Sequence, residues 1–381
     1  MKIGFDTHYI SNAEGSGNGR FAAELVRSLV ALGGEIEYIL YALGDHPFYR
    51  QFAGNKSVRV RLINSPNGFV RNFISLPYVI AQDKPDIVHL HGILPFFLQS
   101  SVVLSVLDLY YLQMPHPTFA EKVIGLLTKW SARRAKQIIT ISEYSKQDII
   151  NRCSVNSNRI NVIPLGVNRL FVPLDTSLVK LKVKQRFGIH GEYILFVGRT
   201  EDPRKDLLTL IEAYAILRSN CYTTALLVIA GRQGPGTAEL FQRMHSLGLD
   251  HNVLMPGIVS DADLPVLISG AQVFVYSSFF EGFGLPVLEA MACGTPVVSS
   301  NATSLPEVVG EAALMVTPGK VEELVQALRQ VLQSSVLRQQ LRERGLQRAK
   351  LFSWERTAQE TLRVYQMVAK KERPAIRDLK T

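Results

Sequence analysis

The feature that most constrains the fold is a repeated alternation of short β-branched runs with amphipathic stretches. In the first half of the chain the runs fall at residues 2–5, 38–42, 58–63, 87–91, 102–107, 138–141 and 161–164. Helical patterns lie between several of them, at 20–32, 70–81, 119–135 and 143–151. Continuous apolar strands separated by helices predict a parallel sheet that is covered by helices on both faces.

The alternation stops after Gly166, where Pro173 and a mixed polar composition indicate a linker over residues 171–186. A second series then begins, with predicted strands at 193–197, 225–230, 253–256, 273–276, 296–299 and 314–316. We therefore predict an α/β protein of two Rossmann-like, doubly wound domains, 1–170 and 187–353, followed by a helix at 354–371. In such sheets ligands bind at the carboxyl ends of strands, and we expect a central cleft between the domains to hold them.

Charge suggests an anionic partner. Lys and Arg outnumber Asp and Glu by 42 to 33, and the segment Lys122–Arg159 holds eight basic residues against two acidic ones. Residues 58–71 are also basic. Such faces suit phosphates, nucleic acid or an anionic membrane surface, and a solvated helix face is the alternative. Basic residues do not interleave with aromatic residues as in an RNA-reading module, so we expect no nucleic acid as partner.

Cysteines and the N-terminus point to the cytoplasm. The three cysteines (Cys153, Cys221 and Cys293) are far apart and lack CxxC spacing, which disfavours a disulfide framework and a zinc site. The N-terminus reads as a strand from its start, without the pattern of a signal peptide. His89 and His91 alternate on a strand, but no third ligand is evident nearby, so we expect no metal site.

Three motifs carry the chemistry. The glycine loop GSGNGR, Gly15 to Arg20, precedes a helix and suits either contact with a phosphate or acceptor, or a plain turn. The motif GRTEDPRK follows an apolar strand and brings Arg199, Arg204 and Lys205 to that strand's carboxyl end, where cations bind phosphate oxygens. It lacks the P-loop pattern, so ATP hydrolysis is not indicated. A solvated basic turn is the alternative.

The third motif is EGFGLPVLEAMACGTPVVSS, residues 281–300. Glu281 lies in the loop, and Glu289 lies in the helix among apolar neighbours, where a buried carboxylate needs a partner. The two carboxylates suit paired hydroxyls, and the amides of Phe283, Gly284 and Leu285 suit an anion. This combination indicates a sugar, a ribose and a diphosphate, with a salt-bridged helix as the alternative. Asp108, after another apolar run, is a candidate cleft residue or a strand-end cap.

The Glu281-x7-Glu289 pattern resembles the signature of the retaining GT-B glycosyltransferases of the "glycosyl transferases group 1" family. The resemblance extends to GSGNGRFAAEL, IVHLHG, ITISEYSKQDI, VIPLGV, ILFVGRTEDPRKDLLTLIEAY, VLMPGIV, SLPEVVG and FSWERTAQETLRVY, and so covers nearly the whole chain. It implies transfer of a sugar from a nucleotide sugar with retention and without an obligatory metal or other cofactor. It also implies that the last helix, 354–371, crosses back to the N-terminal domain, which binds the acceptor.

The resemblance implies a role for each site residue. Arg199 and Lys205 would bind the donor diphosphate, Glu281 the transferred sugar and Glu289 the ribose. The amides of Phe283 and Gly284, with Leu285 beside them, would reach phosphate or sugar. Gly17 and Gly19 would lie beside the phosphates or acceptor, and Gly257 and Ile258 near the base. Asp108 joins the catalytic candidates. Many relatives have a His before this Asp, where the present chain has Leu107.

These observations favour a hexosyltransferase that uses GDP-mannose and builds envelope polysaccharide on a glycan or lipid-linked acceptor. We expect it in the cytoplasm, peripheral on the inner face of the membrane where its basic patches meet anionic lipid. Two alternatives stay open at this point. One is a soluble synthase of a small glycoside or sugar phosphate, and the other is a non-catalytic nucleotide-sugar-binding protein, which Leu107 keeps open.

Overall fold

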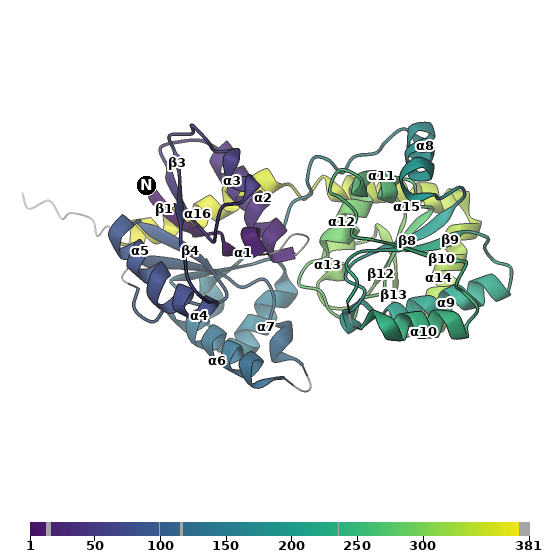
Figure 1. Ribbon diagram of the computed structural model, residues 1–381, viewed down its shortest axis with the longest axis horizontal. Coiled ribbons are helices and arrows are strands. Elements are labelled where there is room, and N and C mark those ends of the chain that lie inside the picture. Colours follow the sequence, from purple (N-terminus) through teal and green to yellow (C-terminus); the bar gives the residue numbers. More distant parts are fainter. Residues whose placement is uncertain (13–16, 99, 115–116, 235, 373–381) are drawn as a thin grey trace, which may run out of the picture. The chain divides into compact units, whose positions relative to one another are not determined.

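The computed structural model describes residues 1–12, 17–98, 100–114, 117–234 and 236–372 (Figure 1). The chain divides into two compact units, one formed by Met1–Gly166 with the segment from Ser353 onward, the other by Val167–Phe352. In the described residues each unit contains one sheet, of seven and six strands, and the paired strands are parallel. The predicted α/β class with two doubly wound domains is therefore confirmed.

The first sheet has the strand order β3-β2-β1-β4-β5-β6-β7. Its strands are β1 (Lys2–Asp6), β2 (Glu37–Ala42), β3 (Val58–Leu62), β4 (Ile87–His91), β5 (Ser101–Ser105), β6 (Gln137–Thr140) and β7 (Ile160–Val162). The order reverses direction between the neighbours β1 and β4, because β1 leads outward to β2 and β3 while β4 leads to β5.

Helices cover both faces of this sheet. They are α1 (His8–Asn12), α2 (Gly17–Ala31), α3 (Pro47–Arg50), α4 (Gly68–Val70), α5 (Leu76–Asp83), α6 (Phe119–Arg134), α7 (Glu143–Cys153) and α16 (Trp354–Glu372). The predicted helix over 70–81 is a run of α4, one π-helical turn (Arg71–Ser75) and α5. Helix α6 begins at a capping box, in which Thr118 Oγ1 accepts from the Glu121 amide and the Glu121 carboxylate accepts from the Thr118 amide.

The C-terminal helix α16 belongs to the first unit and packs on α2. Its Tyr365 hydroxyl lies 2.5 Å from His89 Nδ1, and His89 Nε2 lies 2.6 Å from Ser105 Oγ. Burial and the neighbouring His91 lower the pKa of His89 well below its ordinary value, so this ring is neutral. His89 is therefore part of a buried network that ties α16 to strands β4 and β5.

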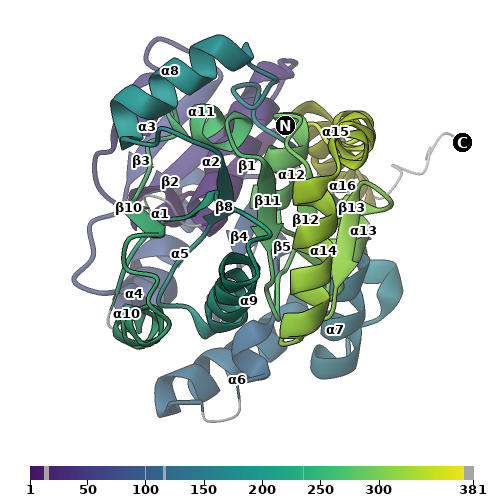
Figure 2. The ribbon, with the colours of Figure 1, turned by 90° about the vertical axis from the view of Figure 1, so that its right-hand side faces the viewer.

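The second sheet has the order β10-β9-β8-β11-β12-β13 and reverses between β8 and β11. Its strands are β8 (Tyr193–Val197), β9 (Leu226–Ala230), β10 (Val253–Gly257), β11 (Val273–Tyr276), β12 (Val297–Ser300) and β13 (Ala313–Val316). Its helices are α8 (Thr176–Phe187), α9 (Leu207–Ser219), α10 (Thr237–Ser246), α11 (Leu264–Ser269), α12 (Leu285–Ala292), α13 (Leu305–Val309), α14 (Val321–Gln333) and α15 (Ser335–Ala349). Figure 2 shows α9 and α14 on one side of this sheet and α11 and α12 on the other.

The segment expected to be a linker, 171–186, instead contains most of helix α8, which packs on α11 in the second unit. The Asp175 side chain caps the helix by accepting from the Leu178 amide at 3.0 Å, and Gly188 ends it in the left-handed conformation. Only Val179 and Val183 are buried, so the apolar stripe that would have predicted this helix is narrow.

No helix in the described part of the chain is both long and apolar enough to cross a membrane. The apolar segment 92–113 instead contains the buried strand β5 and the short 3₁₀ turn Tyr110–Leu112.

The ends of three strands in the second sheet are held together by glycine. The Gly198 amide donates to Ala230 O at 2.9 Å, and the Gly231 amide donates to Gly257 O at 2.8 Å. Gly231 has φ of 146°, and a Cβ atom there would lie 1.8 Å from Gly198 O. Only glycine fits at this crossing of the loops that follow β8 and β9.

We expect Gly231→Ala to destabilise the second unit by more than about 2 kcal/mol, because the methyl group collides with backbone. Gly248→Ala is the matched control, since Gly248 also has positive φ (66°) but no atom within 4 Å of the added Cβ. The control change costs only backbone strain, about 1 kcal/mol. Urea unfolding of both variants measures the difference, and equal losses would contradict the close approach at Gly231.

Candidate functional site

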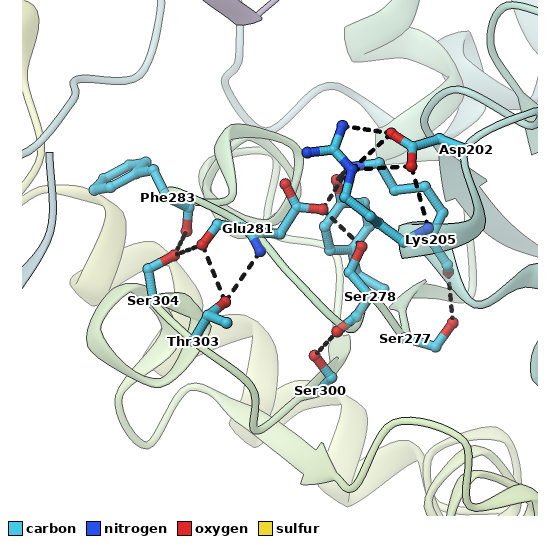
Figure 3. A network of polar contacts seen from close by, with 11 residues as sticks. Asp202, Lys205, Ser277, Ser278, Glu281, Phe283, Ser300, Thr303 and Ser304 are labelled. Carbon is cyan, nitrogen blue, oxygen red and sulfur yellow. Dashed lines mark hydrogen bonds and ion pairs between the residues drawn. The ribbon is translucent and has the colours of Figure 1, made fainter. Parts of the chain in front are cut away.

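Lys205 and Glu281 meet where the second sheet reverses its strand order. Lys205 ends the 3₁₀ turn Pro203–Lys205 that follows β8, and Glu281 lies in the loop that follows β11. Strands β8 and β11 are neighbours, so their carboxyl ends bring these two loops together. Lys205 Nζ donates to Glu281 Oε1 and, at 3.0 Å, to the Tyr276 hydroxyl (Figure 3).

The Lys205 ammonium is charged although it is buried. Only 10% of its side chain and 14% of that of Glu281 are exposed. Burial by itself would lower the pKa of Lys205, but Tyr276 and Glu281 outweigh it and raise this pKa above its ordinary value. Burial and the Glu281 charge also raise the pKa of Tyr276, so its hydroxyl keeps its proton. The site thus holds a buried positive charge next to a carboxylate at neutral pH.

Hydroxyl groups fix the position of Glu281. Ser278 Oγ donates to Glu281 Oε1 at 2.6 Å. Thr303 Oγ1 accepts from the Glu281 amide at 3.0 Å and contacts Glu281 O at 3.0 Å. Ser304 Oγ lies 2.9 Å from Glu281 O and 3.1 Å from Phe283 O (Figure 3). Both the side chain and the backbone of Glu281 are therefore held from the loop after β12 and the end of β11.

Helix α12 begins directly after this loop. Gly284 precedes it with φ of 109°, and a Cβ there would lie 2.5 Å from Leu305 Cδ2. Glycine offers no side chain to cap the first amides of α12, at Leu285 and beyond, which leaves that end of the helix suited to an external anion. Phe283 is buried and packs edge-on against Phe352, with ring centroids 5.9 Å apart. Glu289 lies within α12 and is 2% exposed.

The other two cations of the GRTEDPRK motif have acidic partners next to them. Arg204 forks onto Asp202, with Nε 2.9 Å from Oδ1 and Nη2 2.5 Å from Oδ2. Although burial would raise the pKa of Asp202, Arg204 lowers it below its ordinary value. Arg199 is exposed, and its Nε donates to Glu201 Oε1 at 3.1 Å. Arg199 is thus the accessible cation of the motif, and Lys205 the buried one.

Gly257 and Ile258 lie on the same edge of the sheet. Gly257 is the last residue of β10, with φ of 76°, and its carbonyl accepts from Gly231. The Ile258 side chain is 72% exposed. The β10 end is separated from the β8 end only by β9, so these residues stand beside the Gly198 loop.

Three of the candidates, Gly17, Gly19 and Asp108, lie in the first unit. Gly17 and Gly19 lie in the first turn of α2, which begins at Gly17 and not at residue 20 as expected. Gly15 and Ser16 lie outside the described residues. Asp108 Oδ1 accepts from the amide of Tyr110, the first residue of a 3₁₀ turn, at 3.1 Å, and the Leu107 carbonyl accepts from Ser145 Oγ at 2.9 Å.

Sequence reasoning missed the residues that support the Lys205–Glu281 contact. Tyr276 ends strand β11 and Ser278 follows it, both within the sequence VFVYSS. The apolar pattern of this sequence predicts only a buried strand. Thr303 precedes the SLPEVVG motif and adopts a left-handed conformation, with φ of 52°. A non-glycine residue in that conformation would have been a signal, but it is visible only in the structure.

Comparison with known proteins identifies the class. Residues 180–348 match the family "Glycosyl transferases group 1", and residues 15–169 match "Glycosyltransferase Family 4". Together the two matches cover most of the chain, including every candidate residue above. The chain therefore belongs to the group 1 glycosyltransferases.

Individual relatives agree with this assignment. The chain is 37% identical over 235 residues to O-antigen chain mannosyltransferase B of Escherichia coli, covering 61% of each chain. It is 34% identical over 245 residues to an MMP α-(1→4)-mannosyltransferase of Mycolicibacterium hassiacum, over 63% of this chain and 56% of that protein. The matches thus span less than two thirds of either relative. By sequence the chain is similar to mannosyltransferases.

The structure is similar to that of sucrose-phosphate synthase from Thermosynechococcus elongatus. The TM-score is 0.79 at 20% identity, and the match covers 97% of this chain and 100% of the other. This likeness establishes the GT-B fold.

Thr303→Val removes the hydroxyl that bonds to the backbone of Glu281 while conserving side-chain volume. Because one hydrogen bond contributes about 1 kcal/mol, we expect amide hydrogen exchange at Glu281 to become roughly fivefold faster. Thr303→Ser keeps the hydroxyl and serves as the control. Unchanged protection of the Glu281 amide in Thr303→Val would show that Thr303 does not hold this loop.

Proposed function

We propose that the protein is a hexosyltransferase that moves a sugar from a nucleotide sugar to a glycan or lipid-linked acceptor in envelope polysaccharide biosynthesis. The observation that carries the proposal is the contact of Lys205 with Glu281 at the strand-order reversal, within the segment that matches the group 1 glycosyltransferases. A buried cation beside a carboxylate suits a ligand that has both phosphates and hydroxyl groups.

Each candidate residue takes a role in donor binding. Lys205 neutralises the donor diphosphate from within the loop, and the exposed Arg199 approaches it from outside. Glu281 accepts hydrogen bonds from the hydroxyls of the transferred sugar, and Glu289 from those of the ribose. The amides of Phe283, Gly284 and Leu285 face the phosphate at the start of α12. Gly257 and Ile258 lie against the base.

The reaction breaks the bond between the anomeric carbon and the diphosphate oxygen and forms a bond from that carbon to an acceptor hydroxyl. The acceptor proton passes to the departing diphosphate. Transfer on the same face retains the anomeric configuration and needs no separate side-chain base. Lys205 and Arg199 stabilise the charge that develops on the leaving group, which is the task of a metal ion in other transferases, so we expect activity without added metal.

The favoured donor is GDP-mannose. Both sequence relatives above are named as mannosyltransferases, and they act on different acceptors according to their names. This pattern supports mannose as the transferred sugar more strongly than it supports any one acceptor. For the first unit we propose that Gly17, Gly19 and Asp108 contribute to the acceptor side, with Leu107 replacing a sugar-contacting His.

We also propose that the protein works in the cytoplasm, peripherally on the inner face of an anionic membrane, where a lipid-linked acceptor would be found. The support is the basic segment Lys122–Arg159 in the first unit. Free cysteines at positions 153, 221 and 293 are in keeping with a reducing compartment.

Substitution at Lys205 and Glu281 tests the roles separately. We expect Lys205→Ala to weaken nucleotide-sugar binding at least tenfold in calorimetry, because the diphosphate loses a buried charge partner. We expect Glu281→Gln to reduce transfer at least a hundredfold while nucleotide diphosphate binding stays within a fewfold of the wild type.

The matched controls are Lys180→Ala and Glu322→Gln, which change exposed residues on helices α8 and α14. Because removal of one partner from a buried pair costs stability, the melting temperature of each variant is measured first. Folded variants with wild-type binding and transfer would contradict the assigned roles.

A thermal-shift screen identifies the donor. Since a ligand that binds only the folded state raises the melting temperature, we expect GDP-mannose and GDP to give larger shifts than UDP-glucose, UDP-N-acetylglucosamine or UDP-galactose. A larger shift with a uridine nucleotide would overturn the choice of GDP. Binding of GDP-mannose without transfer to any glycan or lipid-linked acceptor would favour the non-catalytic alternative.

A further inference from the structure

Helix α6 presents the opposite of the usual pattern of burial. Its buried residues are small or polar: Gly125, Thr128, Ser131 and Ala132. Several of its large apolar residues face solvent, with Phe119 83% and Leu126 68% exposed and Val123 also exposed, while Leu127 and Trp130 are partly buried. A helix on the surface of a globular protein ordinarily buries its apolar stripe. In α6 the apolar stripe faces solvent instead. Only a partner outside the described residues could shield these side chains from water.

The two sets lie on opposite faces of the helix. At 100° per residue, Phe119, Val123, Leu126 and Trp130 fall on one narrow stripe, since they follow the i, i+4, i+7, i+11 spacing. The four buried residues fall on the reverse face. The stripe is therefore exposed from Phe119 to Leu126, and it ends at Trp130, which is partly buried against the core.

Aromatic contacts extend this stripe onto two neighbouring segments. Trp130 packs against Phe96, with ring centroids 5.2 Å apart, and Phe96 stacks on Phe73 at 4.6 Å. Phe73 in turn contacts Phe69 at 4.9 Å, and Phe69 is 66% exposed at the start of α4. Phe97, next to Phe96, is 91% exposed. We call these residues and the α6 stripe the aromatic face; it spans α4, the π-helical turn, the 96–97 loop and α6.

Basic residues border the aromatic face. On the helical wheel Lys122, Lys129 and Arg133 flank the α6 stripe on one side. Arg134 lies at its end, over the Trp130 ring at 5.4 Å, and lines the same hollow as Phe97. Within α6 the acidic residue is Glu121, whose carboxylate binds the Thr118 amide and hydroxyl.

We propose that the aromatic face is the surface by which the protein docks on an anionic phospholipid bilayer, with the α6 stripe lying in the interface. An apolar stripe of aromatic and aliphatic residues flanked by Lys and Arg is the pattern of a helix that lies in a membrane surface. The flanking cations bind anionic headgroups, and the Phe and Leu side chains enter the boundary with the acyl chains. The inference rests on the membrane part of the proposed function and names the surface responsible.

Vesicle flotation of the full chain tests the proposal. We expect the wild type to bind vesicles of phosphatidylcholine with 30% phosphatidylglycerol, roughly tenfold less to phosphatidylcholine alone, and less at high salt. The double variant Phe119→Ser/Leu126→Ser should lose at least tenfold in binding, since both side chains are exposed and the fold tolerates their change. Lys122→Glu/Lys129→Glu should lose binding to the anionic vesicles.

The matched control is Val336→Ser, which removes an exposed apolar side chain (66% exposed) from α15 in the second unit and should bind as the wild type. Wild-type binding by the Phe119/Leu126 variant, or no vesicle binding by the wild type, would overturn the proposal. So would a dimer in light scattering that this variant converts to a monomer, because a second copy would then cover the face. GDP-mannose binding is measured on the same samples. A protein that binds GDP-mannose but not vesicles would contradict only the proposed docking surface. A protein that binds vesicles but not GDP-mannose would contradict only the proposed transferase function.

Discussion

The buried ion pair of Lys205 with Glu281 is the interaction on which the proposed chemistry depends. The two residues are 76 positions apart in the sequence, and they meet only because β8 and β11 are neighbours in the second sheet. An isolated buried ammonium would lose its proton. Although burial lowers the pKa of Lys205, Tyr276 and Glu281 raise it above its ordinary value, so the site carries a buried positive charge before any ligand arrives. In the proposed function, a diphosphate that binds Lys205 would free Glu281 to bind sugar hydroxyls.

The structure around the pair supports it from three strands. Glycines allow the loops after β8 and β9 to pack closely together. At Gly231 a side chain would collide with the backbone of Gly198. The Glu281 backbone is held by Thr303 and Ser304 from the loop after β12. Thr303 adopts a backbone conformation that costs a non-glycine residue free energy, and its two contacts with Glu281 offer a physical reason for that cost.

The sequence predicts those elements whose local pattern of apolar residues is enough to specify them. Apolar β-branched runs gave strands such as Tyr193–Val197 and Val273–Tyr276 with the bounds that the structure has. Helix α8 escaped prediction because it buries only two residues and Pro173 lies just before it, so that its signal lay in the caps Asp175 and Gly188.

Part of the site was also within reach of sequence reasoning. Lys205 and Glu281 stand in recognisable motifs, while Tyr276, Ser278 and Thr303 act through tertiary contacts that no local pattern records. The α6 stripe shows a different limit of prediction from sequence. Its periodicity predicts a helix correctly, but periodicity does not say which face the fold buries. The reversed burial became visible only when Gly125 and Thr128 were seen in the core and Phe119 in solvent.

A crystal structure of the protein with a nucleoside diphosphate bound tests the central claim most directly. The account predicts a diphosphate oxygen within about 3 Å of Lys205 Nζ, with the contact between Lys205 and Glu281 lengthened or broken. It also predicts the remaining phosphate oxygens near the first amides of α12. A diphosphate bound at another edge of the sheet, with Lys205 still on Glu281, would contradict it.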